Sequence, residues 1–229
     1  MTPTSVSYRR IYVWELPVRA FHWINAAAIT VLGLTGFIIG HPFSVAYTQE
    51  ASFQYWFGTV RFIHFLAGYI FLINMLMRIY WGFVGNAYSN WKEFIPTSRS
   101  WIGDIKEVLK VDILQTSVHG PVHVGHNRLA GLIYFGTFWM FLFQALTGFA
   151  LYAPMSRLFV GKLATWIVPI LGGDQNVRHL HHTMLWFYVA FAIVHVYLVF
   201  YHDYVEGRGT TSSMVGGWKF EREDYLDKH

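Results

Sequence analysis

Two histidines fourteen positions apart, His181 and His195, lie within one long apolar stretch of this chain. Fourteen residues is close to four whole turns of an α-helix, so both side chains leave nearly the same face, roughly 21 Å apart along the axis. Two further histidines, His22 and His64, stand at the beginnings of earlier apolar stretches. Imidazoles are costly inside a bilayer and mark functional positions there. The pattern indicates metal or haem sites stacked across a membrane.

The composition is that of a membrane protein. Of the 229 residues, 54% are apolar and only 13% are charged, whereas soluble domains have about 25% charged residues. The chain has no cysteine, which excludes disulfides, cysteine-ligated iron–sulfur clusters and thiolate-ligated haem. Redox chemistry in this chain would use histidine or methionine ligands. The basic residues cluster beside apolar stretches and serve orientation in the membrane, so we expect no nucleic-acid partner.

Four apolar stretches are long enough to cross about 30 Å of hydrocarbon. They run approximately over residues 21–40, 62–84, 129–152 and 181–201. The expected fold is therefore an all-α membrane protein, with residues 1–229 forming a single domain built on a four-helix transmembrane bundle. A shorter apolar run over residues 158–171 contains Lys162 and Pro169 and is expected to lie at the membrane interface instead of crossing. Residues 101–114 combine charged and aliphatic side chains at helical spacing and predict a second surface helix.

The distribution of Lys and Arg predicts how the chain is oriented. With the N-terminus in the cytoplasm, thirteen of the 17 basic residues lie on the cytoplasmic side, and the other four are Arg61, Arg157, Lys162 and Arg178. This excess favours cytoplasmic N- and C-termini. No internal repeat is evident. Residues 202–229 are expected to form a cytoplasmic tail that is polar and loosely ordered on its own after Gly207.

This orientation places the four histidines at two depths. His22 begins an outward span near the cytoplasmic face, and His64 begins an inward span near the external face. His181 begins the last span on the external side, and His195 lies about 21 Å further in. Depth therefore pairs His64 with His181 and His22 with His195. Two imidazoles fill both axial positions of a haem iron and leave no site for dioxygen, so electron transfer is the expected role.

Helical geometry also separates His181 from its neighbour. Around the axis, His181 lies about 40° from His195, whereas His182 lies about 140° away. His181 is thus the expected ligand, and His182 is expected at the interface or behind the ligands. Gly68, four residues after His64, is on the same face and could admit a porphyrin edge. The alternative is an ordinary helix contact, because small residues are common between membrane helices.

Short motifs spread over residues 11–205 carry a family resemblance. They are Arg19-Ala-Phe-His22-Trp23 with Leu34-Thr35-Gly36, Arg61-Phe-Ile-His64-Phe, Met77-Arg-Ile-Tyr80-Trp with Gly85-Asn86, Gly125-His126-Asn127, Thr147-Gly148-Phe-Ala-Leu-Tyr152 and His195-Val-Tyr197. Together they resemble the b-type cytochrome subunit of membrane-bound nickel–iron hydrogenases. The wider superfamily includes the cytochrome b subunits of formate dehydrogenases, in which four haem ligands lie on the same helices. Some relatives have His-x-x-His-Arg where this chain has Arg178-His-Leu-His181-His182, which leaves His181 as the matching ligand.

The resemblance implies a haem b anchor, held in the bacterial cytoplasmic (inner) membrane, for a periplasmic hydrogenase with a large nickel–iron subunit and a small iron–sulfur subunit. Electrons would enter an outer haem on His64 and His181 and pass to an inner haem on His22 and His195. They would then reduce quinone near the cytoplasmic face, as a step of the respiratory chain. Two haems are expected, and at least one. The subunit itself would activate no hydrogen, although it could contribute the quinone-reduction site.

Quinone reduction needs polar groups near the inner haem. Asn127 resembles the position of a quinone-contacting asparagine in the formate dehydrogenase relative, and the alternative is a helix N-cap. Haem propionates commonly have basic partners, for which Arg19, Arg61 and Arg78 are candidates. Snorkelling or orienting arginines are the alternative for each of them.

Two other functions remain open at this point. One is the cytochrome b subunit of a formate dehydrogenase or of another quinone-linked oxidoreductase, although the motif over residues 19–36 favours hydrogenase. The other is a non-redox membrane anchor or transporter that uses its histidines as a proton relay. A visible spectrum separates them, because six-coordinate haem b has sharp α and β bands when reduced.

Overall fold

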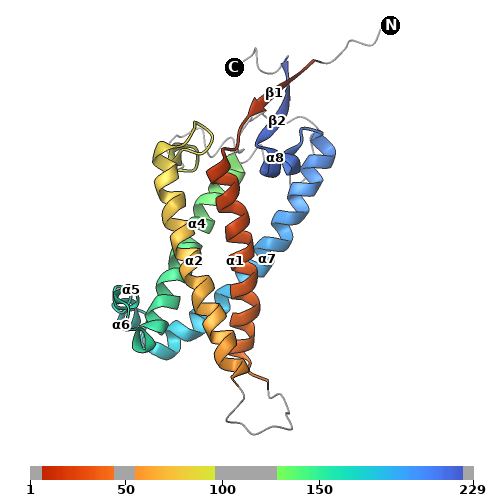
Figure 1. The fold of residues 1–229 in the computed structure, drawn as a ribbon. Helices are drawn as coiled ribbons and strands as arrows, with labels where there is room; N and C mark the ends of the chain where they lie inside the picture. Colours follow the sequence, from red (N-terminus) through yellow and green to blue (C-terminus); the bar gives the residue numbers. More distant parts are fainter. Residues whose placement is uncertain (1–6, 44–54, 96–127, 224–229) are drawn as a thin grey trace. The chain divides into compact units, whose positions relative to one another are not determined.

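The computed structural model describes residues 7–43, 55–95 and 128–223. Four long helices dominate these residues (Figure 1), namely α1 (Leu16–Gly40), α2 (Trp56–Val84), α4 (Arg128–Tyr152) and α7 (Asp174–Glu206). All four are long and apolar enough to cross a membrane. The chain is thus an integral membrane protein of the all-α class, as its composition predicts. The surface helix expected over residues 101–114 lies outside the described residues.

The long helices extend beyond the apolar stretches that predict them, because backbone hydrogen bonds continue where side chains become polar. The clearest case is α7, which begins seven residues before the apolar stretch. Gly172 and Gly173 have φ of 83° and 106°, a conformation that ends one helix and allows another to begin. The negative charge of Asp174 in the first turn stabilises the N-terminal end of α7, where the helix dipole is positive. Asp174 also accepts a 3.1 Å hydrogen bond from Arg178. Gly207, at φ 63°, ends α7.

The apolar run over residues 158–171 does not span a membrane. It forms two short helices, α5 (Phe159–Lys162) and α6 (Ile167–Ile170). Ala164 and Ile167 from this run pack with Phe149 and Ala150 of α4 in one buried cluster. This run therefore forms no helix long enough to cross a membrane, and its place at the membrane interface stays a prediction.

Contacts divide the chain into two compact units. Unit 1 comprises residues 1–20, 78–138 and 195–229, and unit 2 comprises residues 21–77 and 139–194. In unit 2, α1, α2 and α4 share a buried core made by Ala28, Phe71, Met75 and Ala145. The fourth helix joins this core where Tyr188 of α7 stacks on Phe141 of α4, with ring centroids 5.8 Å apart. Unit 2 thus contains segments of all four long helices.

Unit 1 contains a small sheet that joins the two ends of the described chain. Strand β1 (Tyr8–Tyr12) pairs antiparallel with β2 (Trp218–Arg222), so that Tyr8 lies opposite Arg222 and Tyr12 opposite Trp218. A short helix, α8 (Thr210–Gly216), precedes β2. The expectation of a loosely ordered tail is therefore wrong for residues 210–222. The tail is ordered because β2 pairs with a strand about 200 residues away, and the local sequence of the tail does not reveal that partner.

A partly buried polar network connects the beginning of α1 to the segment that follows α2. The Oε2 atom of Glu15 accepts hydrogen bonds from Trp81 Nε1 and the Asn86 backbone N–H, both at 2.9 Å, and from Ser89 Oγ at 3.3 Å. Next to it, Trp14 donates from Nε1 to Ser213 Oγ at 3.1 Å. These bonds fix the entry into α1 within unit 1.

Candidate functional site

Helices α2 and α7 bring two of the predicted ligands together. The ring centroids of His64 and His181 are 6.5 Å apart, and the ring planes are inclined at 76°. Metal–imidazole nitrogen bonds are about 2.0 Å long, so two imidazoles on opposite sides of one metal ion have centroids roughly 6 Å apart. The two side chains therefore have the spacing that a single metal ion between them requires.

Each of these rings contacts a threonine of another helix, α1 for His64 and α4 for His181. Thr35 Oγ1 of α1 lies 2.9 Å from His64 Nδ1, and Thr147 Oγ1 of α4 lies 2.9 Å from His181 Nδ1. Both threonines are buried. Because the contacts are made at Nδ1, the two threonines do not occupy the Nε2 atom of either ring.

A glycine follows each threonine and gives the imidazole room beside the helix. A Cβ atom on Gly36 would lie 3.3 Å from His64 Cε1, and one on Gly148 would lie 3.0 Å from His181 Cε1. Both distances are shorter than the 3.5–4.0 Å of an optimal carbon–carbon contact. A Cβ atom at either position would push the ring back by a few tenths of an ångström, so glycine favours the observed approach of the rings.

Gln144 of α4 lies beside the Nε2 atom of His181. Its Nε2 donates to the His181 carbonyl oxygen at 3.2 Å and lies 3.4 Å from His181 Nε2. Its Oε1 is buried and has no hydrogen-bond partner among the described residues. A glutamine in an apolar span could have been noticed from sequence, but nothing in its spacing connects it to a histidine.

The donor set fits haem better than a metal ion bound by protein alone. Among the described residues, no three His, Cys, Asp or Glu side chains come together as a metal site. Two protein ligands are too few for a closed structural zinc site. A haem iron needs only two axial ligands, since the porphyrin supplies the others. The residues at His64 and His181 therefore fit a haem iron.

Gly68, one turn after His64 on α2, has open space beside it. A Cβ atom built there would meet no described atom within 4 Å, unlike one at Gly36 or Gly148. The space is compatible with a porphyrin edge, and that role stays a prediction.

His182 lies in a different environment from His181. Its ring centroid is 5.1 Å from that of His41, and its ring abuts Gly40, where a Cβ atom would collide with it. His182 is thus part of a contact at the end of α1, away from the histidine pair.

The predicted inner pair is divided between the two units. His22 belongs to unit 2, where its ring lies edge-on to Trp23 at 5.0 Å. His195 belongs to unit 1, and its side chain is exposed. The pairing of these two histidines stays a sequence prediction. Asn127, the predicted quinone contact, lies outside the described residues.

The three candidate arginines all contact protein groups. Arg61 Nη2 donates to Met155 Sδ at 2.6 Å, and Arg19 donates to the Val215 carbonyl oxygen. Arg78 is buried and donates to the Ser89 carbonyl oxygen at 3.1 Å. A role with haem propionates stays a prediction for each.

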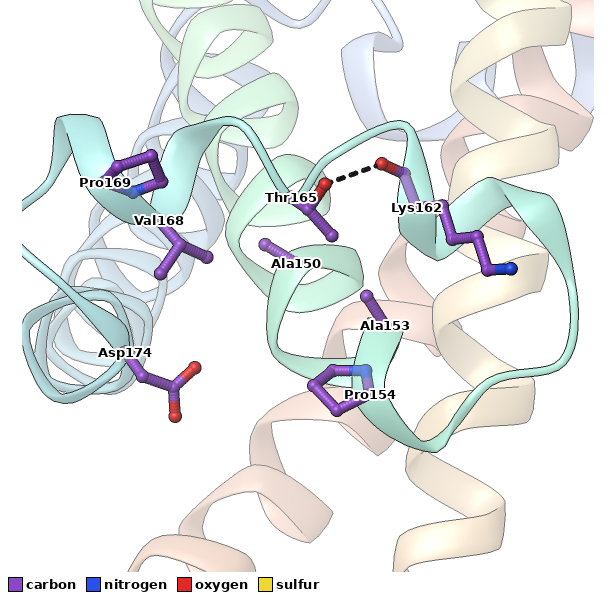
Figure 2. A pocket seen from close by; sticks show the side chains of 8 residues that line it. All are labelled: Ala150, Ala153, Pro154, Lys162, Thr165, Val168, Pro169 and Asp174. Atoms are coloured by element: carbon purple, nitrogen blue, oxygen red, sulfur yellow. Dashed lines mark hydrogen bonds between the residues drawn. The ribbon is translucent and has the colours of Figure 1, made fainter.

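A separate open pocket lies beside the C-terminal end of α4 (Figure 2), with a volume of about 450 Å³. Its lining is mostly apolar and comprises Ala150, Ala153, Pro154, Lys162, Thr165, Val168, Pro169 and Asp174. Thr165 Oγ1 donates to the Lys162 carbonyl oxygen at 2.8 Å, the dashed line in Figure 2. None of the predicted site residues lines this pocket, so it is not the histidine site.

Comparisons with known proteins find similarity along nearly the whole chain. A family model described as prokaryotic cytochrome b561 matches residues 13–217. The chain is 39% identical over 217 residues to a protein of Cupriavidus necator, covering 93% of this chain and 88% of the relative. It is 37% identical over 221 residues to one of Azotobacter chroococcum mcd 1, covering 95% and 91%. Both relatives are named "Probable Ni/Fe-hydrogenase B-type cytochrome subunit".

A similar relative comes from Escherichia coli K12. It is 35% identical over 214 residues, which cover 91% of this chain and 90% of the relative, and is named "Probable Ni/Fe-hydrogenase 1 B-type cytochrome subunit".

Proposed function

Because the chain belongs to the prokaryotic cytochrome b561 family, we propose that it is the electron-transfer anchor of a nickel–iron hydrogenase. In this role it binds haem b and passes electrons from the small iron–sulfur subunit, which is bound to the large nickel–iron subunit, to membrane quinone. The b-type cytochrome family implies haem b, and the names of the relatives imply further hydrogenase subunits. The observation that supports haem binding most directly is the His64–His181 pair.

The two imidazoles of this pair would hold the outer haem. Bound haem supplies one-electron exchange at its iron. His64 and His181 would both hold its iron, which would leave no position for dioxygen or substrate. Their rings are 6.5 Å apart and each is fixed at Nδ1 by a buried threonine. Because ligands that are already oriented need little rearrangement, this arrangement suits rapid electron exchange.

From their predicted depths in the membrane, His22 and His195 would hold the inner haem. His195 follows His181 by four turns of α7, so the two tiers would be roughly 21 Å apart along that helix. An electron entering at one tier would then cross most of the membrane by moving to the other. With two tiers, the protein binds two haems.

The direction of electron flow follows from the proposed orientation. With both termini in the cytoplasm of a bacterium, the excess of basic residues lies inside, and the His64–His181 tier faces the periplasm. The iron–sulfur subunit would dock at that face, and quinone would accept electrons at the other, near Asn127. The surrounding apolar surfaces of the four spans would contact lipid of the inner membrane.

Hydrogen-driven reduction of the purified complex tests this function. Under hydrogen, the complex should develop the sharp α and β bands of reduced six-coordinate haem b, with two haems per cytochrome chain. Replacing His181 with alanine should remove one haem, whereas replacing the exposed neighbour His179 should leave both. A folded complex without these bands contradicts haem binding. Haems that dithionite reduces and hydrogen does not would instead favour another quinone-linked oxidoreductase.

A further inference from the structure

We propose that Thr35 and Thr147 are positioning residues, which fix the tautomer and the ring orientation of His64 and His181 through two equivalent half-sites. In each half-site, one helix contributes a Thr-Gly pair and another contributes the imidazole. This inference rests on the proposed haem function of the histidine pair, and it assigns a role to residues that the ligand set alone does not explain.

The first half-site is made by α1 and α2. Thr35 Oγ1 lies 2.6 Å from the Val31 carbonyl oxygen and 2.9 Å from His64 Nδ1. A hydroxyl has one hydrogen to donate, and a carbonyl oxygen can only accept. The Thr35 hydroxyl therefore donates to Val31, and its oxygen accepts a hydrogen from Nδ1 of His64.

The second half-site is made by α4 and α7 and has nearly the same dimensions. Thr147 Oγ1 lies 2.8 Å from the Phe143 carbonyl oxygen and 2.9 Å from His181 Nδ1. The Thr147 hydroxyl likewise donates its one hydrogen to the Phe143 carbonyl oxygen, so His181 donates to Thr147 from Nδ1–H. Both imidazoles then present the lone pair of Nε2, the atom that a metal between them would bind.

A short sequence repeat underlies the two half-sites. Leu-Thr-Gly-Phe occurs at residues 34–37 and again at residues 146–149. In both copies the threonine bonds the imidazole and the glycine makes room for its Cε1 edge, at virtual Cβ distances of 3.3 and 3.0 Å. Four residues are too few to show as an internal repeat in the sequence. The repeat becomes meaningful only when both copies are seen to grip a histidine of another helix.

Back-bonding of threonine to its own helix does not by itself explain this arrangement. Thr30 on α1 donates to the Ala26 carbonyl oxygen at 2.8 Å, and Thr137 on α4 donates to the Tyr134 carbonyl oxygen at 2.9 Å. Such bonds are common for threonine in helices. What distinguishes Thr35 and Thr147 is the additional bond to a histidine of a neighbouring helix.

An acceptor on Nδ1–H has two chemical consequences for a ligating imidazole. It holds the ring in one orientation, and it increases the basicity of the ligand. A more basic ligand stabilises ferric haem relative to ferrous haem. The two threonines should therefore increase haem affinity and lower the reduction potential of the outer haem.

Paired substitutions in the full-length complex test the proposal. Thr35→Val and Thr147→Val keep the branched shape and remove the hydroxyl, whereas Thr35→Ser and Thr147→Ser keep the hydroxyl. Matched controls on the same helices are Thr30→Val and Thr137→Val. The readouts are haem bound per chain, the electron paramagnetic resonance spectrum of the ferric haem, and its midpoint potential.

The valine variants should bind outer haem about 10- to 100-fold more weakly, as for other groups that orient metal ligands. Their ferric signal should shift as the ring turns, and the potential should rise. A tenfold preferential loss of ferric affinity is about 59 mV for one electron. The serine variants should resemble the wild type, as should both controls.

The comparison of serine with valine keeps the test decisive if a substitution also weakens folding. Equal behaviour of the serine and valine variants in haem content, ferric signal and potential overturns the proposal, whether both are normal or both defective. If the wild-type complex binds no haem, the proposed function itself is wrong. If it binds haem and the valine variants are unchanged, only the role of the threonines is wrong.

Discussion

Replacing Gly148 with alanine should weaken haem binding at the His64–His181 pair while leaving the helix intact. The new Cβ atom would lie 3.0 Å from His181 Cε1 and 3.7 Å from both ring nitrogens. Since an optimal carbon–carbon contact is about 3.5–4.0 Å, the imidazole must move away from α4 by a few tenths of an ångström. Metal–ligand distances vary by only about 0.2 Å, so a movement of this size would displace His181 from a metal held between the two histidines.

The size of the effect follows from the cost of overpacking. Inserting one methyl group into a well-packed site costs about 1–3 kcal/mol, which corresponds to haem binding about 5- to 150-fold weaker. Gly36→Ala should have a smaller effect, because its virtual Cβ lies 3.3 Å from His64 Cε1. Alanine favours a helix over glycine by about 0.5–1 kcal/mol. The helix itself should therefore not lose stability.

The assay is titration of haem into haem-depleted protein in detergent, followed by the α band of the reduced protein. Gly136→Ala on the same helix is the matched control, because a Cβ there would meet no described atom within 4 Å. Wild-type haem affinity and an unchanged spectrum in Gly148→Ala would refute the steric argument. Equal losses in Gly148→Ala and Gly136→Ala would refute it too, since they would point to a general effect of alanine.

Three further predictions concern single positions. His181→Ala should remove one haem and His179→Ala none, as measured by the haem-to-protein ratio, and equal ratios in the two variants would contradict the ligand assignment. Gly68→Leu should weaken haem binding if a porphyrin edge fills the open space beside α2, and a normal haem titration would leave that space to lipid or to helix packing. Glu15→Leu leaves three partly buried donors without their shared acceptor and should cost about 1–3 kcal/mol, or about 2 to 12 °C in Tm. Unchanged thermal unfolding would show that this network is dispensable.

The four spans are predictable from sequence because hydrocarbon imposes a minimum length and an apolar composition on each of them. The spacing of His181 on its helix is equally local, since the helical repeat fixes the face on which a side chain lies. Helix ends are less predictable, and α7 begins at Asp174, well before its apolar stretch, because two glycines precede it and an acidic residue begins its first turn.

Contacts between side chains of different helices cannot be predicted from the sequence of either helix. The partnership of Thr35 with His64 joins residues of two helices, and no periodicity in either helix encodes it. Gln144 likewise gains meaning only from the position of His181 beside it. The ordered tail was missed for the same reason, since the partner of β2 is a strand near the other end of the chain.

The pairing of β1 with β2 constrains how many times the chain crosses the bilayer. Hydrogen-bonded strands must share one aqueous compartment, because an open two-stranded sheet is not stable across hydrocarbon. Residues 8–12 and 218–222 are paired in this way, so the path between them makes an even number of crossings. Four helices satisfy that parity, whereas a fifth crossing by the apolar run at 159–170 would place the two strands on opposite sides and separate them.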